Sequence, residues 1–331
     1  MTSNRLSVER AEPAAIQPEG GFADLRIAVL VPCYNEAAAI AQVVAAFRQA
    51  LPSARILVFD NNSTDDTVAI AAQAGAETRH VIRQGKGNVV RRMFADVEAD
   101  LYLLVDGDAT YDAASAPALI DRLLADGLDM VVGARKDQQT EAYRPGHRFG
   151  NRVLTEFVAR VFGRAFNDIL SGYRVFSRRF VKSFPAIATG FEIETELTIH
   201  ALELRMPIAE VETPYFARPA GSVSKLNTWR DGARILRTIV RLYQLQRPLS
   251  FFSWIAAGLS ALAIVISIPV FITFLETGLV PRLPTALLST GLMLLASLSL
   301  TCGVVLDNVT RGRQEMKRLF YLGIEGIRRN G

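Results

Sequence analysis

Two carboxylates one residue apart, Asp106 and Asp108, are the residues of this chain whose types and spacing most clearly suggest chemistry. They directly follow the apolar run 101–105, which is short, unbroken and β-prone, as a buried parallel strand is. In open α/β sheets, ligands bind in the crevice beyond the carboxyl ends of the strands. Hard carboxylate oxygens at that place suit Mg²⁺ or Mn²⁺ bound to a diphosphate. The simpler alternative is an Asp-Gly turn with a helix cap, and the short pattern alone does not separate the two.

The surrounding sequence alternates between short apolar runs and segments with helical spacing. Strands are predicted at 25–31, 55–59, 77–82, 101–105 and 130–132. Helices are predicted at 37–49, 65–74, 88–97 and 114–125. Ser63 or Thr64 is placed to cap the helix at 65–74. This alternation predicts an α/β fold with a parallel sheet covered by helices on both faces.

Polar residues follow three of the predicted strands. Tyr34 and Glu36 come after the first strand, Asp60 and Asn62 after the second, and Asp106 after the central one. Because the carboxyl ends of parallel strands share one edge of a sheet, these residues predict the lining of a single nucleotide crevice. An aromatic ring at Tyr34 suits stacking on a base, and a carboxylate at Asp60 suits ribose hydroxyls or a base edge.

Three polar segments combine glycine with cations or hydroxyl groups. They are 85–87, which contains Lys86, and the segments 167–174 and 218–225. This composition suits a phosphate cradle, although surface turns and loops share it. Glu192 and Glu194 open a predicted helix that runs to about residue 204, and we assign them to the favourable helix N-terminus rather than to a site.

The C-terminal part of the chain is much more apolar than the rest. The chain has 331 residues, a formal charge of +4 and 50% hydrophobic residues. The runs 249–275 and 283–306 contain no charged residue, and each exceeds the roughly 20 helical residues that cross a bilayer core. Lys and Arg gather on the outer flanks of these runs, which predicts a membrane hairpin with both termini in the cytoplasm. Residues 307–331 are then a basic cytosolic tail.

Two segments before the hairpin, 147–163 and 230–247, are basic and amphipathic. Such helices either lie on anionic lipid or pack on their own domain with solvated arginines. We favour the membrane surface for 230–247, because it leads directly into an apolar run, and both interpretations stay open for 147–163. Residues 1–22 contain Pro, Gly and several charges, and are expected to be a disordered lead-in.

Six of these segments, in this order, resemble the family 2 glycosyltransferases that act as polyprenyl-phosphate (dolichyl-phosphate-type) sugar synthases. The segments are 31–36, 60–65, 85–88, 106–108, 171–174 and 218–225. The resemblance implies a GT-A fold over residues 23–229, with a Rossmann-like, mostly parallel sheet, followed by a transmembrane helical hairpin. It also implies inverting transfer of a hexose from a nucleotide-diphosphate sugar to polyprenyl phosphate at the cytoplasmic membrane face. Among donors, the resemblance alone favours UDP-glucose or UDP-N-acetylglucosamine over GDP-mannose.

The resemblance also implies roles for individual residues. The nucleotide-sugar would be held by Pro32, Tyr34, Glu36, Asp60, Asn62, Lys86 and Asp106. Mg²⁺ or Mn²⁺ would be held by Asp106 and Asp108, and Asp108 would serve catalysis through the leaving diphosphate. The phosphates of acceptor or donor would be bound by Arg135, Ser171, Arg174, Arg218, Ser224 and Lys225. Asp168 would orient the arginines or act as a base, and we prefer orientation.

Two residues depart from the family pattern, and they put the metal ligands and the donor base in question. Asn61 stands where many members have a second Asp, and Thr110 stands where several have Gln. Two other functions stay open: a membrane glycosyltransferase acting on another lipid or a growing glycan, and a non-catalytic membrane scaffold. We expect no nucleic-acid partner, and the sequence leaves homo-oligomer formation open.

Overall fold

The computed structural model describes residues 22, 24–137, 168–187, 190, 192–218, 240–241 and 243–327. The chain forms two compact units. The first comprises Met1–Ile235 together with Lys317–Gly331, and the second comprises Leu236–Met316. The chain therefore leaves the first unit and returns to it after the apolar hairpin. The predicted segment 147–163 and most of 230–247 lie outside the described residues.

The first unit contains a seven-stranded sheet with the strand order β3-β2-β1-β4-β6-β5-β7. Its strands are β1 Ile27–Cys33, β2 Arg55–Asp60, β3 Glu77–His80, β4 Leu101–Leu104, β5 Met130–Asp137, β6 Arg174–Ser177 and β7 Ile208–Tyr215. Every pairing is parallel except those of β6, which is antiparallel to both β4 and β5. The predicted α/β fold with a mostly parallel sheet is therefore confirmed, and the five predicted strands correspond to β1 to β5.

The register of the sheet brings the three predicted strand ends to one edge. Cys33 at the end of β1 pairs with Asp60 at the end of β2. On the other side of β1, Leu30 pairs with Leu104 at the end of β4. The polar residues that follow β1, β2 and β4 consequently emerge at the same edge of the sheet, as crevice residues of an open α/β sheet do.

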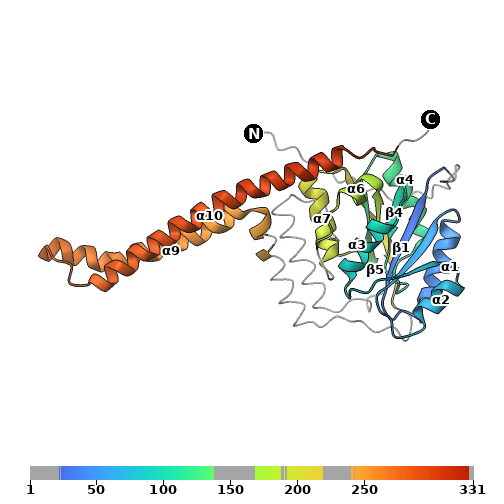
Figure 1. Ribbon diagram of the computed structural model, residues 1–331, viewed down its shortest axis with the longest axis horizontal. Coiled ribbons are helices and arrows are strands. Elements are labelled where there is room, and N and C mark those ends of the chain that lie inside the picture. Colours follow the sequence, from blue (N-terminus) through green and yellow to red (C-terminus); the bar gives the residue numbers. More distant parts are fainter. Residues whose placement is uncertain are drawn as a thin grey trace. The chain divides into compact units, whose positions relative to one another are not determined.

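Helices cover both faces of this sheet, with α1 and α2 on one side and α3 and α7 on the other (Figure 1). One face is covered by α1 Ile40–Ala50, α2 Thr67–Gln73, the 3₁₀ turn η1 Ala113–Ser115 and α4 Ala116–Ala125. The other carries α3 Lys86–Asp96, α6 Arg178–Ser183 and α7 Ile193–Leu204. On the face covered by α1, alternate residues of β1, such as Val29 and Val31, belong to one hydrophobic core with Phe47 of α1. On the face covered by α3, Phe94 makes edge-to-face contacts with Tyr102 and Phe176.

The second unit contains two helices, α9 Pro248–Thr277 and most of α10 Leu283–Leu322. The end of α10, from Lys317 on, belongs to the first unit. Both helices are long and apolar enough to cross a membrane, with mean hydropathies of 2.5 and 1.8 over their best windows. The helices pack through small residues: a Cβ atom added at Gly303 would lie 3.0 Å from the Cβ of Phe252. The Ser299 hydroxyl donates to the Phe252 carbonyl at 3.1 Å. Small residues and hydroxyl bonds of this kind are typical of helix pairs in lipid.

The end of α10, which lies in the predicted basic tail, makes contacts within the first unit. Lys317 forms an ion pair of 2.7 Å with Glu203 of α7. The Tyr321 hydroxyl donates to Asp129, a buried carboxylate just before β5, at 2.6 Å. The guanidinium of Arg179 lies 4.4 Å from the centroid of the Tyr321 ring and also binds Asp129. Residues after the apolar hairpin thus help to satisfy a buried charge of the first unit.

Removal of the Tyr321 hydroxyl should destabilise the first unit. A hydrogen bond to a charged group contributes about 1.5–3 kcal/mol. Tyr321→Phe should therefore lower the melting temperature of the detergent-solubilised protein by roughly 3–10 °C. Phe320→Leu, at an exposed neighbouring position, is the matched control and should leave the melting temperature unchanged. Equal melting temperatures for Tyr321→Phe and the wild type would show that this contact does not stabilise the fold.

Candidate functional site

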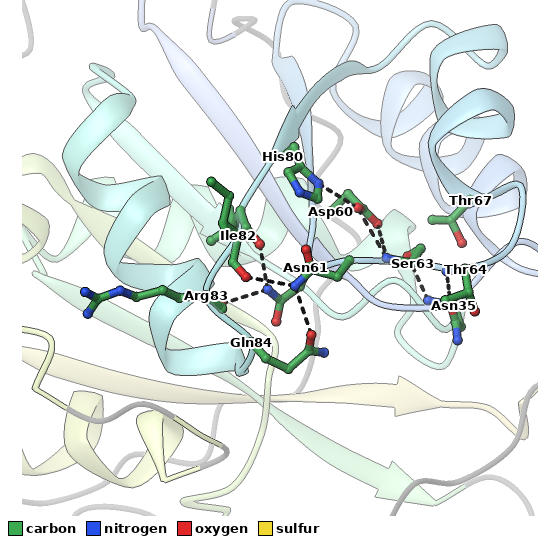
Figure 2. Close-up of polar contacts among 12 residues, drawn as sticks. Asn35, Asp60, Asn61, Ser63, Thr64, Thr67, His80, Ile82, Arg83 and Gln84 are labelled. Carbon is green, nitrogen blue, oxygen red and sulfur yellow. Dashed lines mark hydrogen bonds and ion pairs between the residues drawn. The ribbon is translucent and has the colours of Figure 1, made fainter.

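The loop after β2 begins with the buried carboxylate of Asp60, which accepts from the Ser63 amide at 3.2 Å and lies 3.1 Å from Nδ1 of His80 (Figure 2). These contacts fix the orientation of Asp60 at the sheet edge. Two residues further on, Asn62 has a left-handed backbone conformation with a φ of 65°. Its side-chain amide donates to the carbonyl of Ile82 at 2.9 Å. Two of the predicted nucleotide residues therefore lie in a loop held by hydrogen bonds.

Asn61 is buried and ties this loop to the start of α3. Its amide nitrogen donates to the carbonyls of Val81 at 2.9 Å and Arg83 at 2.8 Å, and its oxygen accepts from the Gly85 amide at 2.7 Å. Figure 2 shows Asn61 beside residues 82–84. An aspartate here could not donate to two carbonyls. The departure from the family pattern thus has a structural reason, because the amide positions the turn that carries Lys86.

The loop after β1 is braced on the loop after β2. The Asn35 amide donates to the Ser63 hydroxyl at 2.9 Å, and the Thr64 amide donates to the Asn35 side chain at 2.7 Å. The Glu36 amide donates to the hydroxyl of Thr67 at 2.9 Å. Ser63 and Thr64 are therefore used between loops, and the expectation that either caps α2 is wrong. Asp66 stands at the cap position of α2, and the Asp65 carboxylate accepts from the Thr67 amide at 3.1 Å.

Tyr34 is the first residue after β1 and is 36% exposed. Pro32 lies inside β1, opposite Phe59, because the strand continues two residues beyond the predicted end. The structure therefore places Tyr34 at the sheet edge with an accessible ring, while Pro32 is part of the strand that leads to it.

The two carboxylates after β4 each contact a cation. The Lys86 ammonium contacts Oδ1 of Asp106 and lies 2.5 Å from Oε1 of Glu194. Asp108 is buried, accepts from the Thr110 hydroxyl at 2.6 Å and lies 2.8 Å from the guanidinium of Arg218. Thr110, the second departure from the family pattern, thus orients Asp108.

Lys86 stays charged although it is buried. Burial opposes protonation of the ammonium, but the carboxylates of Asp106 and Glu194 outweigh it and raise the pKa of Lys86 above its ordinary value. The cluster therefore contains a permanent cation at the sheet edge.

The loop before β6 approaches the same carboxylate through a glycine. A Cβ atom added at Gly172 would lie 2.5 Å from Oδ2 of Asp106. The Gly172 amide donates to the Tyr111 hydroxyl at 2.8 Å, which fixes this close approach. The polar segment 171–174 thus reaches the site by its backbone.

Asp168 and Arg135 form a buried, two-bonded ion pair. Nε and Nη2 of Arg135 donate to the Asp168 carboxylate at 2.6 and 2.7 Å. Burial alone would raise the pKa of Asp168, but the hydrogen bonds from Arg135 outweigh burial and hold this pKa below its ordinary value. The guanidinium also lies 5.5 Å from the centroid of the Tyr215 ring. An ionised, fully engaged carboxylate is suited to orienting Arg135.

Arg174 and Ser171, which the resemblance assigns to phosphate binding, lie in the interior of the first unit. Arg174 is 0% exposed and donates to the carbonyls of Ser171 at 2.9 Å and Ile169 at 2.5 Å, and to the Thr198 hydroxyl at 2.8 Å. Burial lowers the pKa of Arg174 to about 10. Ser171 is buried and donates to the carbonyl of Gly133 at 2.5 Å. Both residues therefore hold the loop in place.

Two of the remaining predicted residues, Ser224 and Lys225, lie outside the described residues. Glu194 lies in the first turn of α7, as the sequence predicts, and its buried carboxylate also contacts Lys86. A signal was present in the sequence, because Glu194 stands between the apolar residues Ile193 and Leu197 on a helix that is buried on most sides. Its oxygen Oε2 has no hydrogen-bond partner among the described residues.

The sheet order and the carboxylates after its central strand define the class of the first unit as a GT-A fold. Solved structures agree at the level of the fold. Glucosyl-3-phosphoglycerate synthase from Mycobacterium tuberculosis, in complex with Mn²⁺, UDP and glucosyl-3-phosphoglycerate, superposes with a TM-score of 0.59 at 23% identity. That match covers 72% of this chain and 87% of the synthase.

Relatives by sequence identify the family. The family described as "Glycosyl transferase family 2" matches residues 28–184. Glycosyltransferase AglJ of Haloferax volcanii is 33% identical over 299 residues, 88% of this chain and 97% of AglJ. Protein RfbJ of Shigella flexneri is 57% identical over 130 residues, which are 38% of this chain and 99% of RfbJ. The chain belongs to glycosyltransferase family 2 and is a glycosyltransferase.

Substitution of Asn61 should loosen the turn that carries Lys86. In Asn61→Asp, a buried carboxylate faces two carbonyls that lose their donor, and each unsatisfied buried group costs about 1–3 kcal/mol. Hydrogen exchange of the backbone amides of residues 82–86 should therefore accelerate about tenfold or more.

Gln73→Glu, the same chemical change at an exposed position of α2, is the control and should leave exchange in that turn unaltered. Wild-type exchange rates in Asn61→Asp would mean that the Asn61 amide does not hold the turn.

Proposed function

We propose that this glycosyltransferase transfers a hexose from a nucleotide-diphosphate sugar to the phosphate of a polyprenyl phosphate at a membrane surface. One observation carries the proposal: Asp106 and Asp108 emerge at the sheet edge, each against a cation, in a chain whose second unit could cross a bilayer. A relative named "Dolichyl-phosphate hexose transferase" from Haloferax volcanii supports this acceptor class. It is 29% identical over 217 residues, 65% of this chain and 93% of the relative.

The donor would lie along the edge formed by the ends of β1, β2 and β4. The ring of Tyr34 is accessible for stacking on a base, and the oriented carboxylate of Asp60 can accept from ribose hydroxyls. Lys86, which begins α3, would face the diphosphate. The preference for a UDP-sugar over GDP-mannose rests on the family resemblance.

The residues at the edge fit a divalent cation whose remaining ligands come from the donor. Asp106 and Asp108 supply hard oxygens, and both already contact positive groups, so this place favours cations. Among the described residues, no group of three or more His, Cys, Asp or Glu side chains could hold a metal by itself. Mg²⁺ or Mn²⁺ bound there would stabilise the charge that develops on the leaving diphosphate.

In the proposed reaction, an oxygen of the acceptor phosphate forms a bond to the anomeric carbon on the face opposite the leaving group. The bond from that carbon to the donor diphosphate breaks, and the electron pair leaves with the diphosphate. A phosphate monoester has a second pKa of about 6 and is largely ionised at neutral pH. The acceptor therefore needs alignment more than proton removal, and Arg135 and Arg218 can supply positive charge for it.

The same argument weighs against a hydroxyl acceptor, such as another lipid or a growing glycan. A hydroxyl nucleophile needs a general base whose pKa lies near the working pH. The pKa of Asp168 is shifted in the opposite direction, because Arg135 holds its carboxylate in the ionised form. Asp168 consequently fits the role of positioning Arg135.

The apolar hairpin has a place in this proposal because the prenyl tail of the acceptor stays in the bilayer. A chain anchored by α9 and α10 meets the phosphate head group where it leaves the lipid. The distribution of Lys and Arg on the outer flanks of the two apolar runs supports a cytoplasmic position for the first unit.

The proposal predicts different losses for two aspartates. Asp108→Asn should lower transfer to undecaprenyl phosphate by about 100-fold or more, because charge stabilisation of the leaving group is weakened. Asp168→Asn should cause a smaller loss and leave the pH dependence of transfer between about pH 6 and 8 unchanged. The measurement uses purified membranes and labelled UDP-glucose, UDP-N-acetylglucosamine and GDP-mannose.

Asp126→Asn, on the exposed end of α4 and paired with Arg122, is the matched control and should keep wild-type transfer. Wild-type transfer by Asp108→Asn would reject the role of this carboxylate. Transfer to a hydroxyl acceptor without transfer to undecaprenyl phosphate would support the alternative acceptors instead.

A further inference from the structure

Lys86 is shared between two carboxylates, the partly buried one of Asp106 and the buried one of Glu194. Its side chain is only 10% exposed, and its ammonium contacts both Asp106 and Glu194. Asp106 comes from the end of the central strand, whereas Glu194 comes from the first turn of α7. A single positive charge thus faces two negative charges in a place from which water is largely removed, and such a cluster favours the arrival of further positive charge.

In the cluster of Lys86, Asp106 and Glu194, one carboxylate oxygen of Glu194 has no hydrogen-bond partner among the described residues. Its carboxylate is buried, Oε1 contacts Lys86 at 2.5 Å, and Oε2 has no hydrogen-bond partner among the described residues. A buried polar atom without a partner costs free energy and points to a bound species or a second arrangement of the site. The natural second arrangement is one in which the Lys86 ammonium moves fully to Glu194.

Asp106 is the carboxylate that would release Lys86. It is the more exposed partner, with 29% of its side chain exposed against 7% for Glu194. A divalent cation at Asp106 carries twice the charge of the ammonium and would displace it. Glu194 would then keep the ammonium charged and next to the place of the donor diphosphate.

We propose that Lys86 is the resident counter-ion of Asp106: its ammonium occupies this carboxylate until the divalent cation and the donor bind, and then turns to the diphosphate while Glu194 retains it. Glu194 is a positioning residue in this exchange. The inference rests on the proposed nucleotide-diphosphate site and adds to it a competition between one side chain and the metal. If Lys86 competes with the metal, it weakens binding of the divalent cation and strengthens binding of the nucleotide diphosphate. A lysine with a purely structural role would not have these two opposite effects.

The test measures Mn²⁺ binding to the full-length, detergent-solubilised protein by electron paramagnetic resonance without nucleotide. It then measures binding of UDP and of GDP, separately, in saturating Mn²⁺. Lys86→Met should tighten binding of Mn²⁺ alone by about tenfold or more, because a competing positive charge has been removed. The same variant should weaken binding of the preferred nucleotide by about tenfold, because the diphosphate loses a cation.

Two further variants keep the test decisive if Lys86→Met folds poorly. Lys86→Met with Glu194→Gln removes one charge of each sign from the cluster, and should bind Mn²⁺ more tightly than Glu194→Gln alone. Glu194→Gln alone should bind Mn²⁺ several-fold more weakly than the wild type, since Lys86 then gives its whole charge to Asp106. Arg92→Met, which removes an exposed cation from the same helix, is the matched control and should change neither affinity.

The exchange is wrong if Lys86→Met and the double variant bind Mn²⁺ with unchanged or weaker affinity, whatever happens to the nucleotide. A wild-type protein that binds neither Mn²⁺ nor a nucleotide diphosphate would reject the proposed function itself, and the exchange with it. Tighter Mn²⁺ binding together with weaker nucleotide binding would establish Lys86 as the competitor.

Discussion

Charge compensation at the end of β4 is the constraint on which the rest of this glycosyltransferase depends. A carboxylate withdrawn from water is tolerated only against a cation or a set of donors. Asp106 and Asp108 obtain theirs from distant parts of the sequence, namely Lys86 at the start of α3 and Arg218 after β7. The sheet must therefore bring three separate chain segments to one edge. This requirement accounts for the many hydrogen bonds between loops that otherwise share no secondary structure.

Neutral groups do much of this positioning. The Asn61 amide joins the end of β2 to the turn before α3. Asn35 joins the loop after β1 to the loop after β2. Gly172 leaves room for Asp106 where any side chain would collide with it. Arg174, although charged, is used in the same manner, since its donors hold the loop before β6. The charged residues at the edge are thus left to contact a ligand, because other residues hold the loops in place.

Local sequence predicts this fold well where one apolar run makes one strand. The strands β1, β2, β4 and β5 follow from such runs, and the carboxylates after β4 follow from the strand before them. By contrast, β6 begins with the buried Arg174, and β7 carries Glu210 and Glu212, so neither strand has an apolar run. The partnership of Glu194 with Lys86 joins residues more than a hundred positions apart. Contacts of that kind depend on the completed sheet, and no local pattern encodes them.

The return of the chain to the first unit after α10 has a consequence for the order in which the protein is completed. Because synthesis proceeds from the N-terminus, Lys317 and Tyr321 leave the ribosome only after both apolar helices have been made. Until then, Asp129 lacks the tyrosine hydroxyl and Glu203 lacks its lysine. The sheet and its site can form early, but the contacts of Lys317 and Tyr321 form only after both apolar helices have been made. Completion of the contacts within the first unit therefore depends on prior synthesis of the second unit.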